Sequence, residues 1–547
     1  MRRLAFLAVL AVFCAPAAAL DLPGDDSCLL AMRDELSRNR ARLRMENFPA
    51  PYFLSYDARS VRLLEITASL GAVIKNQSGC GLEMSGGLRV GSPAFDNSNF
   101  YGAVGGKPET EVGAPDCAYD NIRHNLWQLT DRAYKAAVEK LDQKRAFREK
   151  RSITSQLDDF SPAEPAVLLS TAPPQFPDRA AAAELARRVS AVFGHYPLIE
   201  DSLVTMQFEY GLRRYLNSEG ALYRGGGFSA VVSMAAGTQA PDGYRIPQGR
   251  DFYYASTAAL PGEAFFAAEA EKFAAEMSAL AKSEIISPYI GPVLIEREAA
   301  GAFFYTLLAR HLLRPRMWWN ERGRDPQTGY FYGKLGMRVA APFISVVDDP
   351  SLEQYEGADL AGHYEVDDEG VRARKVELVR KGKLVDLLMS RAPVKERAQS
   401  NGHGRGYYVF PQGTPGNLLV SASNAMPEAQ LKRKLLALCG ELELDYGIIL
   451  RNVPDFYGTF TAWKVYVKDG REEPVHGAQF AEFTLRALRD IAFAGDKAHV
   501  YNYDFNAAAF SIAAPSVILQ EAELKKTESQ PDKLPYLANP YFEKAVR

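Results

Sequence analysis

The sequence predicts an α+β protein of two domains, and three observations support this prediction. The 547 residues exceed the length that a single hydrophobic core usually serves. The first half alternates Gly-punctuated runs of aromatic and β-branched residues with long helical patterns, whereas the second half is rich in short strand-like runs. We therefore expect an N-terminal α/β-mixed domain with an antiparallel sheet and long helices, followed by a C-terminal, mostly antiparallel β domain.

The N-terminal domain is expected to span residues 20–285. Residues 52–90 combine short aromatic and β-branched runs with scattered glycines, which predicts an antiparallel meander. The turn signature Asn217-Ser-Glu-Gly220 follows a strand-like run and predicts a hairpin. Asp178 is placed to cap an Ala-rich helix. In all, helices are expected at residues 26–44, 121–151, 178–194 and 262–282.

The C-terminal domain is expected to span residues 289–547, after a boundary near Pro288. It begins with a strand that leads into one amphipathic helix at residues 298–313, and strands predominate beyond it. Those strands are expected at residues 371–379, 383–389, 417–421 and 446–452. Two further helices are expected at residues 427–439 and 480–493.

The first 19 residues have the pattern of a signal peptide. Arg2 and Arg3 form a basic start, an apolar core follows, and the run Ala17-Ala18-Ala19 supplies a cleavage site. The apolar core is too short to span a bilayer comfortably. We expect cleavage near Ala19 and export to the periplasm or the extracellular space, with no stable membrane insertion. The net charge of -3 and the lack of a Lys/Arg stripe give no reason to expect nucleic acid as a partner.

Export would change the chemistry expected of the cysteines. Four remain after cleavage, namely Cys28, Cys80, Cys117 and Cys439, and none forms a C-x-x-C pair. Cys80 and Cys117 each lie in a Gly-containing segment of one domain, so an oxidising compartment would allow them to form a disulfide. The alternative is a buried, inert thiol at each position. The sequence does not decide between them.

Three motifs follow one another in the second half. The apolar run from Gly291 ends in Glu296-Arg297-Glu298, and Val366-Asp-Asp-Glu-Gly370 and Ser400-Asn-Gly-His-Gly-Arg-Gly406 come later. In this order they resemble the C-terminal half of the TldD/PmbA family, the metallopeptidase-related proteins described as modulators of gyrase. The predicted hairpin around Gly220 resembles that family's N-terminal domain. The resemblance covers most of the mature chain and implies a related fold.

The resemblance also implies a zinc site, for which this sequence lacks the ligands. Family peptidases carry a His-Glu-x-x-x-His motif on the helix and a Cys near the C-terminus. The corresponding run here is Arg297-Glu298-Ala299-Ala300-Gly301-Ala302, and residues 504–515 contain no Cys. Sliding the alignment by two residues places Ile295 and Ala300 at the histidine positions instead. Zinc needs three or four converging ligands, so we predict no metal and no cofactor. Glu298 keeps the position of the family's general base.

Two other segments are candidates for function. His403 and Arg405 are predicted to bind substrate, because glycines let backbone N–H groups approach a peptide and Arg can grip a carboxylate. The alternative is a Gly-rich connection with incidental charges. Asp367-Asp368-Glu369 has the composition of a paired-carboxylate site, but its neighbour Gly370 favours a solvated turn.

Three functions are compatible with these observations. The chain is a non-catalytic or accessory subunit that binds peptides or a family partner, or it is an active peptidase that uses Glu298 or an unrecognised metal site. The third is a homodimeric binding protein that encloses a ligand without reacting. The expected partners are a peptide or protein substrate, and either a second copy of the chain or a family member that carries the zinc motif.

Overall fold

The computed structural model describes residues 26–102, 109–154, 157–170, 176–313, 316, 319–320, 331, 333–406, 411–453, 455–505, 508–528, 531–537 and 539–543. The signal peptide predicted for residues 1–19 lies outside them. Within this part of the chain, an eight-stranded sheet belongs to the N-terminal half and an eleven-stranded sheet to the C-terminal half. The predicted α+β class is confirmed.

Long antiparallel strands build the N-terminal sheet, in the order β2-β1-β7-β8-β9. They are β1 (Pro51–Ser69), β2 (Ala72–Ser92), β7 (Ile199–Asn217), β8 (Leu222–Gln239) and β9 (Arg245–Tyr254). The hairpin prediction is confirmed, but the meander of short strands is wrong. β1 and β2 pair along almost their whole lengths, so the glycines of residues 79–87 lie inside β2. Continuous ladder hydrogen bonds outweigh the weak strand propensity of those glycines.

Helices cover the two ends of this sheet. α1 (Ser27–Arg42) and α2 (Tyr119–Lys150) pack on one end, and α3 (Arg179–Ala191) and α4 (Glu263–Leu280) on the other, each pair with its own apolar core. Asp178 caps α3 as predicted, since its carboxylate accepts from the N–H of Ala181 at 2.7 Å. The short strands here are β3 (Phe95–Asp96), β4 (Phe100–Tyr101), β5 (Glu109–Gly113) and β6 (Val167–Leu169).

The C-terminal sheet is mixed and mostly antiparallel. Its strands are β10 (Glu284–Ile285), β11 (Tyr289–Ile295), β13 (Ile344–Asp348), β16 (Val376–Arg380), β17 (Lys383–Leu384), β20 (Asn417–Ala422), β21 (Tyr446–Leu450), β22 (Phe460–Tyr466), β23 (Glu472–Phe480), β24 (Ile491–Phe505) and β25 (Ala508–Lys526). Because β10 pairs with β23, the chain enters this sheet a few residues before 289. Two-stranded sheets join β4 to β12 (Trp319–Asn320), β14 (Gln354–Tyr355) to β15 (Ala358–Asp359), and β18 (Gly404–Arg405) to β19 (Gln412–Gly413).

The helices of this half differ in part from expectation. α7 (Glu428–Glu441) lies where a helix was predicted, and α8 (Pro540–Glu543) is a short C-terminal turn. The helix predicted at residues 298–313 is α5 (Arg297–Phe304), then a π-helical segment (Tyr305–Ala309), then α6 (Arg310–Leu312). The prediction of a helix at residues 480–493 is wrong. β23 ends at Phe480 and β24 begins at Ile491, and the segment between them contains only a 3₁₀ turn, Leu485–Leu488.

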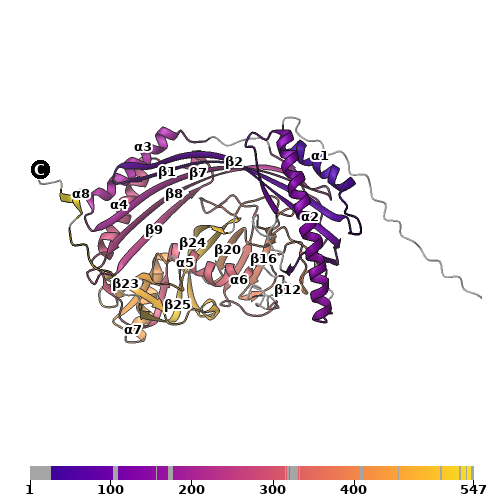
Figure 1. Cartoon of the computed structure of the whole chain (residues 1–547). Helices are drawn as coiled ribbons and strands as arrows, with labels where there is room; N and C mark the ends of the chain where they lie inside the picture. Colours follow the sequence, from indigo (N-terminus) through magenta and orange to yellow (C-terminus); the bar gives the residue numbers. More distant parts are fainter. Residues whose placement is uncertain are drawn as a thin grey trace, which may run out of the picture.

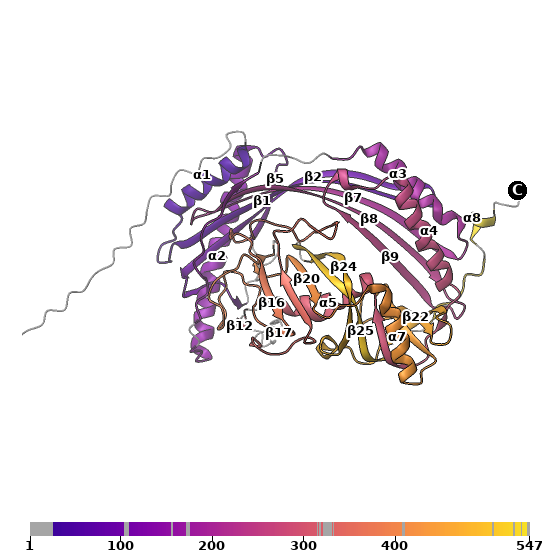
Figure 2. The ribbon, with the colours of Figure 1, turned by 180° about the vertical axis from the view of Figure 1, so that it is seen from behind.

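The long strands form an arch over the C-terminal half (Figure 1). Seen from behind, the C-terminal sheet again lies beneath the arch, with α1 and α2 at one end and α3 and α4 at the other (Figure 2). Because of this arrangement, one face of the N-terminal sheet is directed at the C-terminal half, and the sites described next lie along that boundary.

Among the described residues, no helix combines the length and the apolar character that a membrane crossing requires.

Candidate functional site

Helix α5 presents the run that the sequence singled out for catalysis. It follows β11 directly, and Arg297 at its start has a left-handed φ of 50° while its N–H donates to Ser516 Oγ at 3.2 Å. Glu298 in the first turn is exposed, whereas residues 299–304 are buried. The turn from strand to helix thus holds Glu298 at the surface of the C-terminal half.

Acidic groups from both halves meet near Glu298. Burial raises the pKa of Glu276 on α4, and the charge of Glu298 adds to this rise. Arg250 holds Glu276 at 2.9 Å, and Arg451 holds Glu296 at 3.1 Å. The surroundings of Glu298 are therefore a set of carboxylates separated by guanidinium groups.

The interior side of α5 contains small and aromatic residues. Ala302 is buried, and a Cβ added to Gly301 would lie 2.5 Å from the Cβ of Tyr501 on β24. The ring of Tyr501 lies 4.1 Å from that of Tyr503, which stacks on Tyr305 at 4.2 Å. In the described part of the chain, no three His, Cys, Asp or Glu side chains gather as metal ligands would.

A hydrogen-bonded chain that the sequence did not indicate lies behind the start of α5. Glu428 on α7 accepts from Ser516 Oγ at 2.9 Å and contacts His499 Nε2 at 2.6 Å. Since the hydroxyl of Ser516 donates to Glu428 and accepts from the N–H of Arg297, both of its roles are occupied. These hydrogen bonds fix the start of α5 on β25, and Ser516 does not form a nucleophile–base pair.

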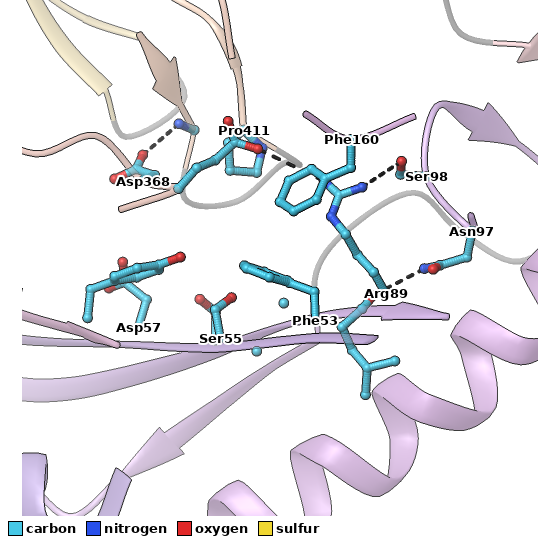
Figure 3. Close-up of a pocket in the computed structure, with 16 residues that line it drawn as sticks. Phe53, Ser55, Asp57, Arg89, Asn97, Ser98, Phe160, Asp368 and Pro411 are labelled. Atoms are coloured by element: carbon cyan, nitrogen blue, oxygen red, sulfur yellow. Dashed lines mark hydrogen bonds and ion pairs between the residues drawn. The ribbon is translucent and has the colours of Figure 1, made fainter. Parts of the chain in front are cut away.

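The second motif, Asp367–Glu369, forms a turn that closes a cavity of about 70 Å³ against the N-terminal sheet. In Figure 3, Phe53, Ser55 and Asp57 of β1 line one side of it, and Asp368 and Pro411 lie across from them. The prediction of a solvated turn is wrong in one respect: the turn exists, but Asp367 is 1% exposed and Glu369 is 6% exposed.

Two arginines of the N-terminal sheet neutralise Asp368. Arg59 lies 2.9 Å from Asp368, and Arg213 lies 2.6 Å from Asp57 and 3.3 Å from Asp368. Burial alone would raise the pKa of Asp368, but these guanidinium groups outweigh burial and hold it below the usual value. Asp57 and Arg59 are two residues apart on β1, and Arg213 is paired with Arg59 on β7, so the three side chains share one face of the sheet. This alternation is the one signal in the sequence that indicates the network.

Asp367 has no such arginine partner and lies beside the charge of Glu369, which Arg89 approaches at 3.9 Å. Burial, and then the charge of Glu369, raises the pKa of Asp367 to about 7, and burial also raises the pKa of Glu369. The N–H of Gly404 donates to Asp367 at 2.9 Å, and the N–H of Arg391 donates to Glu369 at 2.5 Å. The carboxyl group of Asp367 therefore holds its proton through the acidic range up to about pH 7.

His403 and Arg405, the predicted substrate-binding residues, lie beside this turn. His403 is fully buried, and its imidazole bonds to Asp348 at 3.1 Å. Arg405 donates to the carbonyls of Pro415 and Ala509 at 3.1 and 2.7 Å. Both side chains have partners within the protein, and their role in binding a substrate stays a prediction.

All four described cysteines are free, so the disulfide considered for Cys80 and Cys117 is not formed. Cys80 is exposed on β2, whereas Cys117 is buried in the same apolar cluster as Cys28 of α1. The cysteine beside Cys117 is therefore Cys28, and not Cys80 as the sequence analysis considered.

Comparison with known proteins gives matches in sequence and in fold. Residues 290–526 match the model of the PmbA/TldA metallopeptidase C-terminal domain. A metalloprotease of Methanothermobacter thermautotrophicus is 41% identical over 59 residues, 11% of this chain and 12% of its own length. A metalloprotease of Methanocaldococcus jannaschii is 31% identical over 114 residues, 21% of this chain and 23% of its own length. The chain thus matches less than a quarter of each of these two curated relatives.

Solved structures extend the likeness over both halves. TldE from Thermococcus kodakarensis superposes with a TM-score of 0.60 at 12% identity, over 90% of this chain and 99% of that one. A protein described as a putative modulator of a DNA gyrase, from Thermotoga maritima, gives 0.57 at 15% identity, over 90% and 100%. At such identities the likeness shows a shared fold alone.

Proposed function

Because the chain belongs, through residues 290–526, to the PmbA/TldD metallopeptidase family, we propose that it is an exported, non-catalytic or accessory member that binds peptides or a family partner. The sequence of α5 supports this proposal: Arg297, Glu298 and Ala302 stand where the resemblance places the His, Glu and His of the family's peptidases. The remaining surroundings of α5 supply no substitute imidazole or thiolate among the described residues.

These side chains do not fit a zinc ion. Zinc takes three or four nitrogen, sulfur or carboxylate ligands at about 2.0–2.3 Å. Arg297 would repel the cation, Ala302 has no donor atom, and Tyr501 packs against Gly301 on the helix face. The nearby imidazole of His499 is already bonded to Glu428. We therefore derive no catalytic step through a metal at this helix.

Metal content and partner capture test the accessory role together. The chain is purified from the exported fraction by an affinity tag, and zinc is quantified in the chain alone and in whatever it retains. We expect far less than one zinc per chain, and retention of a family member that carries His-Glu-x-x-x-His with its own zinc. Stoichiometric, tightly bound zinc on the isolated chain would overturn the proposal.

Export is the part of the proposal that rests on the signal-peptide pattern of residues 1–19. Expression of the full chain followed by cell fractionation and N-terminal sequencing tests it. We expect the exported protein to begin at Leu20. A chain that keeps Met1 and remains in the cytoplasm would exclude export.

A second candidate function is peptidase activity through Glu298, which the exposure of this carboxylate at the start of α5 favours. A carboxylate without a metal lacks the group that makes water a strong nucleophile at neutral pH, so we expect no cleavage of an unstructured peptide. The test compares the parent chain with Glu298→Gln and with Glu296→Gln, a nearby carboxylate bonded to Arg451. Cleavage that only Glu298→Gln abolishes would establish this second function.

A further inference from the structure

A larger pocket on the other face of the N-terminal sheet is lined by residues beside the starts of α1 and α2. These two helices lie at one end of the arch (Figure 1). The volume of the pocket is about 380 Å³, and Arg62, Cys80, Cys117 and Arg214 are among its lining residues. Side chains alternate between the two faces along a strand, and Arg62 and Arg214 are an odd number of positions from Arg59 and Arg213. They therefore point to the face of the sheet that is directed away from the C-terminal half. The pocket is therefore separate from α5 and from the Asp367–Glu369 turn.

The fold brings two cysteines together at this pocket. Cys117 directly precedes the N-cap of α2, with a left-handed φ of 56°, and its carbonyl accepts from Ser27 Oγ at 2.7 Å. That bond places Cys28, the next residue of α1, close to Cys117, and both side chains lie in one apolar cluster with residues of α1 and α2. Cys28 is fully buried, whereas Cys117 is 8% exposed and reaches the pocket.

The surroundings give the two thiols different chemistry. The neighbouring Cys28 thiol and the charge of Arg214 lower the pKa of Cys117 to about 7, against the effect of burial. The same pairing, together with burial, raises the pKa of the Cys28 thiol. Arg214 is held in place by Asp26, whose carboxylate oxygens lie 2.8 Å from its Nε. Since Cys117 lines the pocket and Cys28 is fully buried, Cys117 is the thiol that a pocket ligand reaches, and Cys28 is placed as the resolving thiol.

Arginines give the pocket a preference for carboxylates. Arg224 shares Asp26 with Arg214 at 2.8 Å, and Asp116 also lines the pocket. Arg62 stacks over the ring of Phe176 at 4.6 Å, and it forms no salt bridge with any carboxylate in the described part of the chain. Its planar group is therefore available for a carboxylate of a small molecule.

We propose that Cys117 and Cys28 form a thiol–disulfide couple that reacts in this pocket with small disulfides bearing carboxylates. The Cys117 thiolate attacks one sulfur of the bound disulfide, the S–S bond breaks, and the departing thiolate takes up a proton. The Cys28 thiol then releases its proton, attacks Cys117 Sγ and displaces the second thiol. One small disulfide is reduced to two thiols while the two cysteine thiols are oxidised to one protein disulfide.

Oxidised glutathione, which carries carboxylates, serves as the probe. The purified, reduced chain is incubated with it at pH 7, quenched by alkylation and mapped by mass spectrometry. We expect a disulfide between Cys28 and Cys117, with Cys439 still reduced. Cys28→Ala should stop at a glutathione adduct on Cys117, and Cys117→Ala should form neither product. Cys439→Ala, a change in a different apolar core, should form the same disulfide as the parent.

Two results would overturn the proposal. One is modification confined to the exposed Cys80. The other is oxidation of Cys28 and Cys117 that is equally fast in Arg62→Met and the parent, whether the probe is oxidised glutathione or the uncharged hydroxyethyl disulfide. We expect Arg62→Met to slow the reaction with oxidised glutathione by about tenfold, the equivalent of one lost charge-assisted bond, and to leave the reaction with the uncharged disulfide unchanged.

Discussion

Lys144, on α2, is the most deeply buried of the lysines that form ion pairs in the described part of the chain. Its side chain is 1% exposed, and its ammonium group donates to Asp159 at 2.5 Å and to the carbonyls of Asp96 and Ser98 at 3.0 and 2.7 Å. Burial lowers the pKa of Lys144 and raises that of Asp159. Each group therefore depends on the other to remain charged.

Replacing Lys144 by Met should destabilise the N-terminal half strongly. The substitution keeps the volume but removes the nearest cation from the buried Asp159 carboxylate, which keeps Arg316 at 3.4 Å and two neutral donors, the N–H of Asp96 and the amide of Asn99. We expect a loss of about 3–5 kcal/mol. Urea denaturation followed by fluorescence measures it. Lys135→Met is the control on the same helix, since its ion pair with Asp131 is exposed and should change stability by less than about 0.5 kcal/mol. Equal effects of the two variants would contradict the argument.

The elements that the sequence predicted well are those whose own residues determine them. The helix expected at residues 121–151 is α2, Tyr119–Lys150, because a continuous apolar stripe specifies it. The strand expected at residues 383–389 is only Lys383–Leu384. Its apolar residues are buried in a core that is completed by residues far away in the sequence. The local sequence therefore predicts burial but not whether the segment forms a strand.

Helix α5 is held against β24 by a close contact at Gly301. A Cβ at this position would lie 2.5 Å from Tyr501 Cβ, which is not the movable end of a side chain. We expect Gly301→Ala to lower the free energy of unfolding by about 1–3 kcal/mol despite the better helix propensity of Ala. Gly211→Ala on β7, where no atom lies within 4 Å of the added Cβ, is the control for denaturation measurements. A stabilised Gly301→Ala would disprove the close packing.

The turn at Asp367–Glu369 shows why the site was harder to predict than the fold. Three acidic residues followed by Gly370 have the local pattern of a surface turn. Arg59 and Arg213, which pair with Asp368 from the N-terminal sheet, lie more than 150 residues earlier, so the turn's own sequence does not reveal its burial. The resemblance placed Glu298 correctly at the start of a helix, but the partners of His403 and Arg405 could not be read from their own segment.

Asp367 should make stability depend on pH. Its pKa is about 7 in the folded protein and about 3.9 when unfolded, so between these values the folded state holds a proton that the unfolded state has released. Stability from this group is therefore full below about pH 4 and is lost as pH rises to about 7. Asp367→Asn should remove this component, which is at most about 1.4 kcal/mol per pH unit.

Denaturation midpoints at intervals from pH 4 to pH 8 measure this component as the difference between the parent and Asp367→Asn. The control is Asp469→Asn, a change at an exposed turn that should follow the parent at every pH. If the parent and Asp367→Asn lose stability in parallel over this range, the folded protein does not hold a proton on Asp367.

At the scale of the whole molecule, buried polar contacts join the arch to the C-terminal half. Arg391 is 1% exposed, donates to both carboxylate oxygens of Glu219 at 2.5 and 3.0 Å, and lies 3.7 Å over the ring of Phe160. At the other end of the arch, His476 bonds to Asp242 at 3.1 Å. Contacts of this kind at both ends should make the two halves unfold together.

Removing the guanidinium of Arg391 should uncouple the halves. In Arg391→Met, Glu219 loses a bidentate partner and the carbonyl of Ser161 loses a donor at 2.9 Å, but Glu219 is 37% exposed and can be rehydrated. We therefore expect a loss of about 2–3 kcal/mol and a calorimetric trace that separates into two transitions. Arg372→Met, which removes one exposed bond of 3.3 Å to the carbonyl of Val167, should keep the parental trace. A single transition at the parental temperature in Arg391→Met would show that apolar contacts alone couple the two sheets.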